Sequence, residues 1–290
     1  MNRISSLTLL SLILIIAGCS EDSADNRVRV MTINVRYDNP NDGVNAWPKR
    51  AAQVAGFIQS EVPDLLGMQE VLLRQYNYLD SALLDYTSVG VGRSDGLQGG
   101  EMNPVFFRTE RFEMVRTKTF WLSDTPEVAG SMGWGASLPR IVTWMELIDK
   151  KNQEHLFFFN THFAHDSDSA RVMSSGILLN EVGKIAGSLP FVITGDFNMT
   201  PDSRGYAIIT ETASSAPLIK DSRVISEAKP YGPIYTFNGF TDNPAQGRID
   251  YIFVRNGTAV VEHNTFFRKD KGIYISDHWP VGATVILQHN

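Results

Sequence analysis

The chain has 290 residues, with 26 Lys or Arg against 32 Asp or Glu, so its formal net charge is −6. That balance weighs against a nonspecific nucleic-acid-binding protein, whose surface is usually basic, without excluding a local basic cleft. The hydrophobic content of 43% is enough for a sizeable core, and a single cysteine excludes an internal disulfide.

The N-terminus has the pattern of a lipoprotein signal peptide over residues 1–18. Arg3 gives a positive start, and residues 7–16 form an apolar stretch too short for a stable membrane-spanning anchor. The small residues before Cys19 resemble a bacterial lipobox, which implies that Cys19 is lipidated; the alternative is an ordinary signal whose cleavage site contains a cysteine. Residues 19–27 are small and polar and predict a flexible tether. We therefore expect an exported protein, lipid-anchored to the bacterial cell envelope at the outer membrane or cell surface.

A single domain is expected over residues 28–290, because no internal repeat or low-complexity linker divides them. It opens with a strand at 28–37, a helix at 46–60 and a buried strand at 65–68. Further predicted elements are helices at 72–84 and 169–189, and strands at 105–108, 112–120, 141–147, 156–161, 191–194, 249–254 and 281–287. Gly and Pro cluster in loops at 90–104, 126–139 and 230–247. Two packed sheets with helices outside account for this mixture.

Polar residues follow or precede these apolar runs at six separated places. They are Asn34, Glu70, His162, Gly195-Asp196-Phe197-Asn198, Asp250 and Ser276-Asp277-His278. Carboxylates, carboxamides and histidines, without a nucleophilic cysteine or an obvious serine elbow, suit a hard divalent cation that activates water against phosphorus. Structural alternatives exist for single positions: Glu70 as a surface side chain, and His162 as a histidine bonded to a backbone carbonyl.

The run from Phe191 to Asn198 is the most specific of these segments. A buried strand leads into a glycine, then an acid and an amide two residues apart, which share one side if the extended geometry continues. The alternative is an Asp/Asn turn that caps the next helix. Asp250 at the start of one strand and His278 just before the last strand suggest an acid that fixes a histidine tautomer; the alternative is a salt bridge without chemistry.

Taken together, the six segments resemble the endonuclease/exonuclease/phosphatase superfamily, which includes deoxyribonuclease I, exonuclease III, sphingomyelinases, inositol-polyphosphate phosphatases and deadenylases. The resemblance spans about residues 28–288. It implies an α/β fold, a four-layered sandwich of two packed mixed β-sheets flanked by helices. Segments such as Gly133-Trp134 and Pro139-Arg140 look closest to an exported bacterial branch related to deadenylase-like enzymes.

The resemblance also implies roles for individual residues. Glu70 would be the principal ligand of Mg²⁺ or Mn²⁺, with Asn34 beside it holding metal or phosphate, and Asp277 helping at the metal or its waters. Four further residues complete the implied set, with Asp196 aligning or deprotonating water, Asn198 binding the scissile phosphate, and His162 and His278 stabilising developing charge. Asp250 would orient His278. Whether Asp196 or the Asp250–His278 pair takes the proton stays open.

Two arginines are expected to bind substrate phosphate, because planar guanidinium groups suit phosphate oxygens. They are Arg140 and Arg171, and the alternative for each is a solvated or helix-capping role. Trp47, Trp121 and Trp134 offer stacking surfaces, although core packing is the ordinary role of tryptophan.

The expected function is metal-dependent hydrolysis of a phosphodiester or phosphomonoester by in-line attack of water. Nuclease, phospholipase- or sphingomyelinase-like, and sugar- or nucleotide-phosphatase activities all stay open. The acidic balance and the tether favour a small phosphoester or lipid headgroup over nucleic acid, and we expect a monomer. Two alternatives are a non-catalytic, ligand-binding surface lipoprotein on the same fold and a glycan-binding protein that uses exposed tryptophans.

Overall fold

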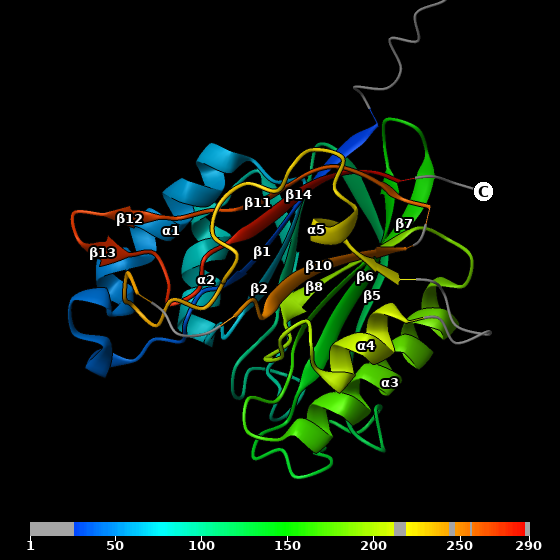
Figure 1. The fold of residues 1–290 in the computed structure, drawn as a ribbon, viewed down its shortest axis with the longest axis horizontal. Coiled ribbons are helices and arrows are strands. Elements are labelled where there is room, and N and C mark those ends of the chain that lie inside the picture. Colours follow the sequence, from blue (N-terminus) through cyan, green and yellow to red (C-terminus); the bar gives the residue numbers. More distant parts are fainter. Residues whose placement is uncertain (1–25, 212–218, 244–246, 256, 288–290) are drawn as a thin grey trace, which may run out of the picture.

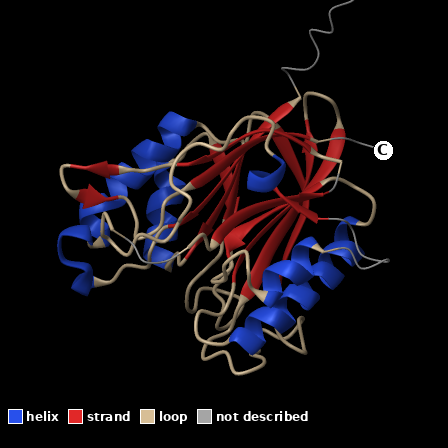
Figure 2. Cartoon of the chain, in the orientation of Figure 1, coloured by secondary structure: helices blue, strands red, loops and turns tan. Residues whose placement is uncertain are grey.

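The computed structural model describes residues 26–211, 219–243, 247–255 and 257–287. Two six-stranded β-sheets pack face to face at its centre, and helices cover both outer faces (Figure 1). Figure 2 shows the same four layers by element type. The predicted four-layered sandwich is therefore confirmed. The predicted signal peptide and Cys19 lie outside the described residues, and within those residues no helix is both long and apolar enough to cross a membrane.

The first sheet has the strand order β11-β14-β1-β2-β4-β3. Its strands are β1 (Arg27–Asn34), β2 (Leu65–Gln69), β3 (Tyr86–Val89), β4 (Val105–Arg108), β11 (Ala259–Thr265) and β14 (Val281–Ile286). The elements on its outer side are the 3-10 helix η2 (Pro40–Asn45), α1 (Trp47–Glu61) and α2 (Leu73–Ala82), at the left of Figure 1.

The second sheet has the order β5-β6-β7-β8-β10-β9. Its strands are β5 (Phe112–Trp121), β6 (Ile141–Asp149), β7 (Glu154–His162), β8 (Phe191–Asp196), β9 (Ile219–Asp221) and β10 (Asp250–Arg255). It is covered by α3 (Asp168–Ala186) and α4 (Arg204–Thr210), at the lower right of Figure 1. The remaining elements are α5 (Ser222–Ile225) and the small hairpin of β12 (Lys269–Asp270) and β13 (Ile273–Tyr274).

Three apolar clusters fill the three spaces between these layers. The phenylalanine run of β7 shows how the sequence makes two of them: Phe158 packs between the sheets, whereas Phe157 and Phe159 join the cluster that includes residues of α3. Strand side chains alternate between faces, so a continuous apolar run is what a strand buried on both faces requires.

The two parallel strand pairs determine where the polar residues predicted for the site come together. β1 runs parallel to β2 with Asn34 opposite Gln69, and β7 runs parallel to β8 with His162 opposite Asp196. Because the carboxyl ends of parallel strands meet at one edge, each sheet delivers two neighbouring polar ends. β10 lies antiparallel to β8 and begins at Asp250, directly opposite Asp196.

Asn160 ties the two sheets together just before the strand ends. Its Nδ2 donates to the carbonyls of Met68 (2.7 Å) and Pro104 (3.0 Å), and its Oδ1 accepts from Gln69 Nε2 at 2.6 Å. Asn160 and Gln69 are completely buried, and hydrogen bonds between buried polar groups hold those groups in place. The network therefore fixes the spacing between Glu70 and the end of β7.

The first strand is shorter than predicted. It ends at Asn34, because the Asn34 Oδ1 accepts the backbone N–H of Arg36 (2.9 Å) and Arg36 takes a left-handed conformation with φ 57°. An Asn side chain that bonds two residues ahead forms a turn and stops strand pairing.

Candidate active site

A cleft of about 780 Å³ opens where the strand ends of both sheets meet. Most of the residues predicted for the site line it: Glu70, Arg140, His162, Asp196, Asn198, Asp277 and His278. Asn34 and Asp250 do not line it but bond to residues that do. The structure thus brings together chain segments up to 244 positions apart, as the contact of Asn34 with His278 shows.

Asn34 is completely buried beneath the residues that line the cleft. Its Nδ2 lies 3.0 Å from Glu70 Oε1, 2.9 Å from Asp196 Oδ2 and 3.5 Å from His278 Nε2. Because its oxygen already accepts the Arg36 N–H, the amide presents hydrogens rather than a lone pair. Of the two roles implied by the resemblance, this orientation fits the positioning of carboxylate and phosphate oxygens better than direct metal ligation.

His278 forms a buried pair with Asp250. Its Nδ1 lies 2.9 Å from Asp250 Oδ2, and the two residues are 4% and 1% exposed. Burial alone would lower the pKa of His278, but the negative charges of Asp250 and Asp196 outweigh it and hold that pKa well above its ordinary value. These charges therefore favour the imidazolium form of His278, and its Nε2 faces Asp196 and Asn34.

Asp196 lies between the two imidazoles. Its Oδ2 is 3.5 Å from His162 Nε2 and 3.7 Å from His278 Nε2. Burial, with repulsion from Asp250, raises the pKa of Asp196 to about 7. Burial, with the positive charges of Arg140 and Arg93, lowers the pKa of His162 well below its ordinary value, so this imidazole is neutral.

Two positions that carry the chemistry adopt the left-handed conformation: Glu70 has φ 59° and Asn198 has φ 50°. Glu70 follows the last residue of β2, and its Oε2 accepts the Tyr37 N–H at 3.1 Å. The extended geometry expected across residues 196–198 stops at Asp196, because Asp196 Oδ1 accepts the Asn198 N–H at 3.0 Å in a turn. Asn198 still lines the cleft. Residues other than glycine rarely adopt the left-handed backbone conformation, and those that do gather at functional sites.

The donor set suits a hard divalent cation. Glu70, His162 and Asp196 each offer a ligand atom, and these atoms lie within 4.8 Å of one another. Asp277 also lines the cleft, and burial raises the pKa of its carboxyl group to about 6. Oxygen-rich sets of this kind match Mg²⁺ and Mn²⁺, and a cation there would offset the mutual repulsion of these acids.

Three arginines also line the cleft, and the sequence predicted a role for only one of them, Arg140. Arg93 makes a two-point ion pair with Glu101 (2.8 and 2.9 Å), and Arg36 pairs with Asp42 at 3.1 Å. Arg140 is 4% exposed, and among the described residues its Nε and Nη1 have no hydrogen-bond partner. Its Nη2 lies 2.9 Å from His165 Nδ1. Two unpaired, buried guanidinium donors on a residue that lines the cleft suit an anionic ligand.

Arg171 lies outside this cleft. It lines a neighbouring hollow of about 440 Å³, where its Nη1 donates to the carbonyl of Ala164 (2.9 Å) and its Nη2 faces Asp168. Asn198 and Ile249 line both spaces, so the hollow adjoins the cleft.

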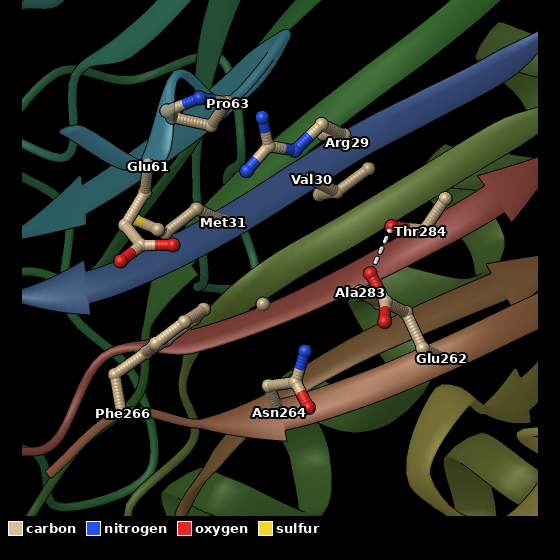
Figure 3. A pocket seen from close by; sticks show the side chains of 11 residues that line it. Arg29, Val30, Met31, Glu61, Pro63, Glu262, Asn264, Phe266, Ala283 and Thr284 are labelled. Atoms are coloured by element: carbon tan, nitrogen blue, oxygen red, sulfur yellow. Dashed lines mark hydrogen bonds between the residues drawn. The ribbon is translucent and has the colours of Figure 1, made fainter. Parts of the chain in front are cut away.

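A third hollow, of about 110 Å³, lies on the first sheet (Figure 3). Its two acids are already paired: Glu262 accepts from Thr284 Oγ1 at 2.9 Å, and Glu61 binds Arg268. It contains no histidine.

The tryptophans that could have formed a glycan-binding surface are largely buried. Trp47 and Trp121 are each only 5% exposed, and Trp134 is partly buried. The premise of the glycan-binding alternative, exposed tryptophans, was wrong for Trp47 and Trp121.

Comparison with known proteins shows which proteins this chain resembles. A solved endonuclease/exonuclease/phosphatase from Bacteroides vulgatus is 37% identical, with a TM-score of 0.86 over 90% of this chain and 99% of that one. A mannosyl-6-phosphatase from Bacteroides thetaiotaomicron is 31% identical, with a TM-score of 0.83 over 89% of this chain and 99% of that one. An uncharacterized protein of Acanthamoeba polyphaga mimivirus is 26% identical over 88% of this chain and 98% of its own length.

The model of the Endonuclease/Exonuclease/phosphatase family matches residues 31–278, a span that begins in β1 and ends at His278. That span contains every segment on which the resemblance was based. The chain therefore belongs to the endonuclease/exonuclease/phosphatase family.

Proposed function

We propose that this protein hydrolyses phosphomonoesters with the help of Mg²⁺ or Mn²⁺, by direct attack of water on phosphorus. One observation carries the proposal: Asp196 Oδ2 lies 3.5 and 3.7 Å from the Nε2 atoms of His162 and His278, in a cleft that Glu70 and Arg140 also line. Family membership supports phosphoester chemistry, and the mannosyl-6-phosphatase relative favours a monoester.

Glu70 would hold the cation, with a ligand atom of Asp196 within 4.8 Å of that of Glu70 and with Asp277 lining the same cleft. When bound, the cation would offset the charge of the phosphate and make phosphorus easier to attack. Protein side chains must then transfer the proton and orient the substrate.

Asp196 is the residue best suited to take the proton from the attacking water. A pKa of about 7 makes its carboxylate a base that works near neutral pH, and its Oδ2 lies at the centre of the polar cluster. The cationic His278, held by Asp250, would stabilise the charge that develops on the phosphate oxygens, together with the Arg140 guanidinium. Asn34 and Asn198 would orient oxygens by hydrogen bonding.

A phosphodiesterase is a second candidate, because the hollow beside Asn198 and Arg171 adjoins the cleft. A diester carries a second esterified group, which extends from the phosphate in another direction. The hollow offers space for that group. Arg171 would then contact a more distant part of the substrate.

The test is a substrate panel offered to the purified protein with EDTA, Mg²⁺ or Mn²⁺. It should contain sugar phosphates, nucleotides, inositol phosphates, sphingomyelin and DNA. The proposal expects turnover of at least one monoester with cation and none with EDTA. Turnover of diesters alone would favour the second candidate, and no metal-dependent turnover of any phosphoester would leave the non-catalytic ligand-binding alternative.

We also propose, from the sequence alone, that the protein is exported and anchored by lipid on Cys19. The support is the signal-like pattern of residues 1–18 and the polar segment 19–27 that follows it. Metabolic labelling with an alkyne fatty acid should mark the full chain, and Cys19→Ser should abolish both the label and membrane sedimentation. Equal labelling of the two proteins would contradict the anchor.

A further inference from the structure

The wall of the cleft next to His162 carries a charge pair, Arg93 and Glu101, that the proposed chemistry does not use. Arg93 holds both oxygens of Glu101, with its Nη1 2.8 Å and its Nη2 2.9 Å from the carboxylate. The nearer oxygen of Glu101 lies 3.9 Å from His162 Nδ1, beyond hydrogen-bond distance. The pair therefore borders the catalytic centre without being part of its hydrogen-bond network.

The loop that carries the pair is rigidly bonded. The Arg93 N–H donates to the Glu101 carbonyl at 3.0 Å, the Arg93 carbonyl accepts Trp121 Nε1 at 2.7 Å, and Met102 is bridged to Val71, the residue after Glu70. Arg93 itself is 7% exposed. A pair held at both of its backbone positions keeps its geometry when a ligand enters, which lowers the entropy cost of binding.

The negative charge of Glu101 restricts which ligand groups can bind beside it. A carboxylate accepts hydrogen bonds and donates none, so it repels the oxygens of the phosphate for which the cleft is otherwise built. A ligand group that binds to the remaining lone pairs of Glu101 must therefore be a hydrogen-bond donor. Arg93 only donates, and its charge neutralises that of Glu101, so an ammonium or a second anion gains little from the pair.

Hydroxyl groups both donate and accept, and neighbouring hydroxyls match an adjacent carboxylate and guanidinium. Resting on the proposed function, we infer that the Arg93–Glu101 pair binds hydroxyls of the leaving alcohol, so that the substrate class is the phosphate monoester of a sugar or another polyol. The imidazole of His165, which lines the same cleft next to Arg140, adds one more polar group on that wall.

The experiment compares two monoesters of similar length, a hexose 6-phosphate and n-hexyl phosphate, with the full-length protein and Mg²⁺ or Mn²⁺. A site that hydrogen-bonds hydroxyls discriminates strongly against an analogue that lacks them, so the ratio of the two kcat/KM values should reach about 10²-fold or more in favour of the hexose. In Glu101→Gln this ratio should fall by about tenfold, because a charged acceptor is lost.

The matched control is Glu146→Gln. Glu146 also pairs with an arginine, Arg116, but on β6 away from the cleft, so this variant should keep the ratio of the parent protein. Using a ratio removes effects on folding or metal binding that both substrates share.

The outcomes separate the two claims. A ratio near one in the parent protein, with metal-dependent turnover of both esters, would overturn the polyol inference and keep the proposed function. A high ratio that survives Glu101→Gln would overturn the assignment to this pair. Turnover of diesters only would overturn the inference while the family chemistry stands, and no turnover of any phosphoester would overturn the proposed function and the inference with it.

Discussion

His278 Nδ1 lies 2.9 Å from Asp250 Oδ2, and this buried contact connects the last catalytic segment of the chain to the strand that runs beside Asp196. The acid makes the imidazole a cation, since the pKa of His278 is raised well above its ordinary value although burial opposes the shift. A neutral side chain in place of Asp250 would remove the contribution of Asp250 to this rise in the pKa of His278.

Asp250→Asn should therefore lower the pKa of His278 and reduce kcat by about 10²- to 10³-fold, the range for loss of one group that stabilises developing charge. The pKa is measured by NMR titration of the imidazole in the metal-free protein, and kcat with saturating cation. Asp149→Asn, which breaks a buried aspartate–arginine pair far from the cleft, should leave kcat of the folded protein intact. Equal kcat in Asp250→Asn and the parent would contradict the role of the pair.

Tyr251 links two catalytic segments through its hydroxyl. The single Oη–H is shared between the carbonyls of Met199 (2.9 Å) and Arg248 (2.8 Å), which follow Asn198 and precede Asp250 respectively. Tyr251→Phe leaves both carbonyls without this donor and should cost about 1–3 kcal/mol of unfolding free energy.

As a positioning residue, Tyr251 should affect kcat more than KM. Steady-state kinetics of Tyr251→Phe check this, with Tyr86→Phe as the control, because the Tyr86 hydroxyl bonds one carbonyl, that of Pro63, outside the cleft. The same loss of stability with an unchanged kcat would reduce Tyr251 to a structural role.

Gly67 lets the two sheets approach each other below the site. A Cβ there would lie 2.5 Å from Asn160 Oδ1, within the network that spaces Glu70 from β7. Gly67→Ala should therefore destabilise the protein by about 1–3 kcal/mol through overpacking. Gly56→Ala is the control, since this exposed position in α1 has nothing within 4 Å, and alanine there should stabilise by about 0.5–1 kcal/mol. Denaturant unfolding measures both, and changes of equal sign would contradict this account.

His263 makes stability depend on pH away from the site. It is 1% exposed and lies 2.9 Å from Ser222 Oγ, and burial, with the positive charges of Arg223 and Arg248, lowers its pKa to about 3. The unfolded chain takes up a proton near the ordinary pKa of 6.5, whereas the folded protein does not, so stability is full above that pH and falls as the pH drops toward 3.

Between pH 6.5 and 5 this one group removes about 2 kcal/mol of unfolding free energy. His263→Gln cannot titrate, so its unfolding free energy should fall less over that interval than that of the parent protein. Urea unfolding at both pH values measures the difference. Parallel curves for the two proteins would show that His263 is not responsible.

The sequence predicted the long strands and the residues at their ends because each buried strand is an apolar run that a polar residue stops. β7 and β8 show this clearly, and their parallel pairing brings His162 and Asp196 together. The short or exposed elements gave no such signal: β3 is partly buried throughout, and β11 carries the polar run Glu262-His263-Asn264, since it is an edge strand.

The part of the cleft made by loops could not be predicted from periodicity. The left-handed turns at Glu70 and Asn198 arise from side-chain hydrogen bonds and tertiary packing, which leave no repeat in the sequence. Glu101 follows two glycines in a segment read only as a surface loop, and its partner Arg93 lies eight positions earlier across the same loop. Arg171 was chosen by residue type alone, and the structure places it in the adjoining hollow.

The central claim is that Glu70, His162, Asp196 and His278 form one cation-assisted hydrolytic centre. The most direct measurement is the rate of phosphomonoester hydrolysis by EDTA-treated protein as Mg²⁺ or Mn²⁺ is added, for the parent chain and for Glu70→Ala. The account predicts saturable activation of the parent and loss of nearly all activity in Glu70→Ala at the same cation concentrations, with both proteins folded. Undiminished hydrolysis by Glu70→Ala, or full activity of the parent in EDTA, would contradict it.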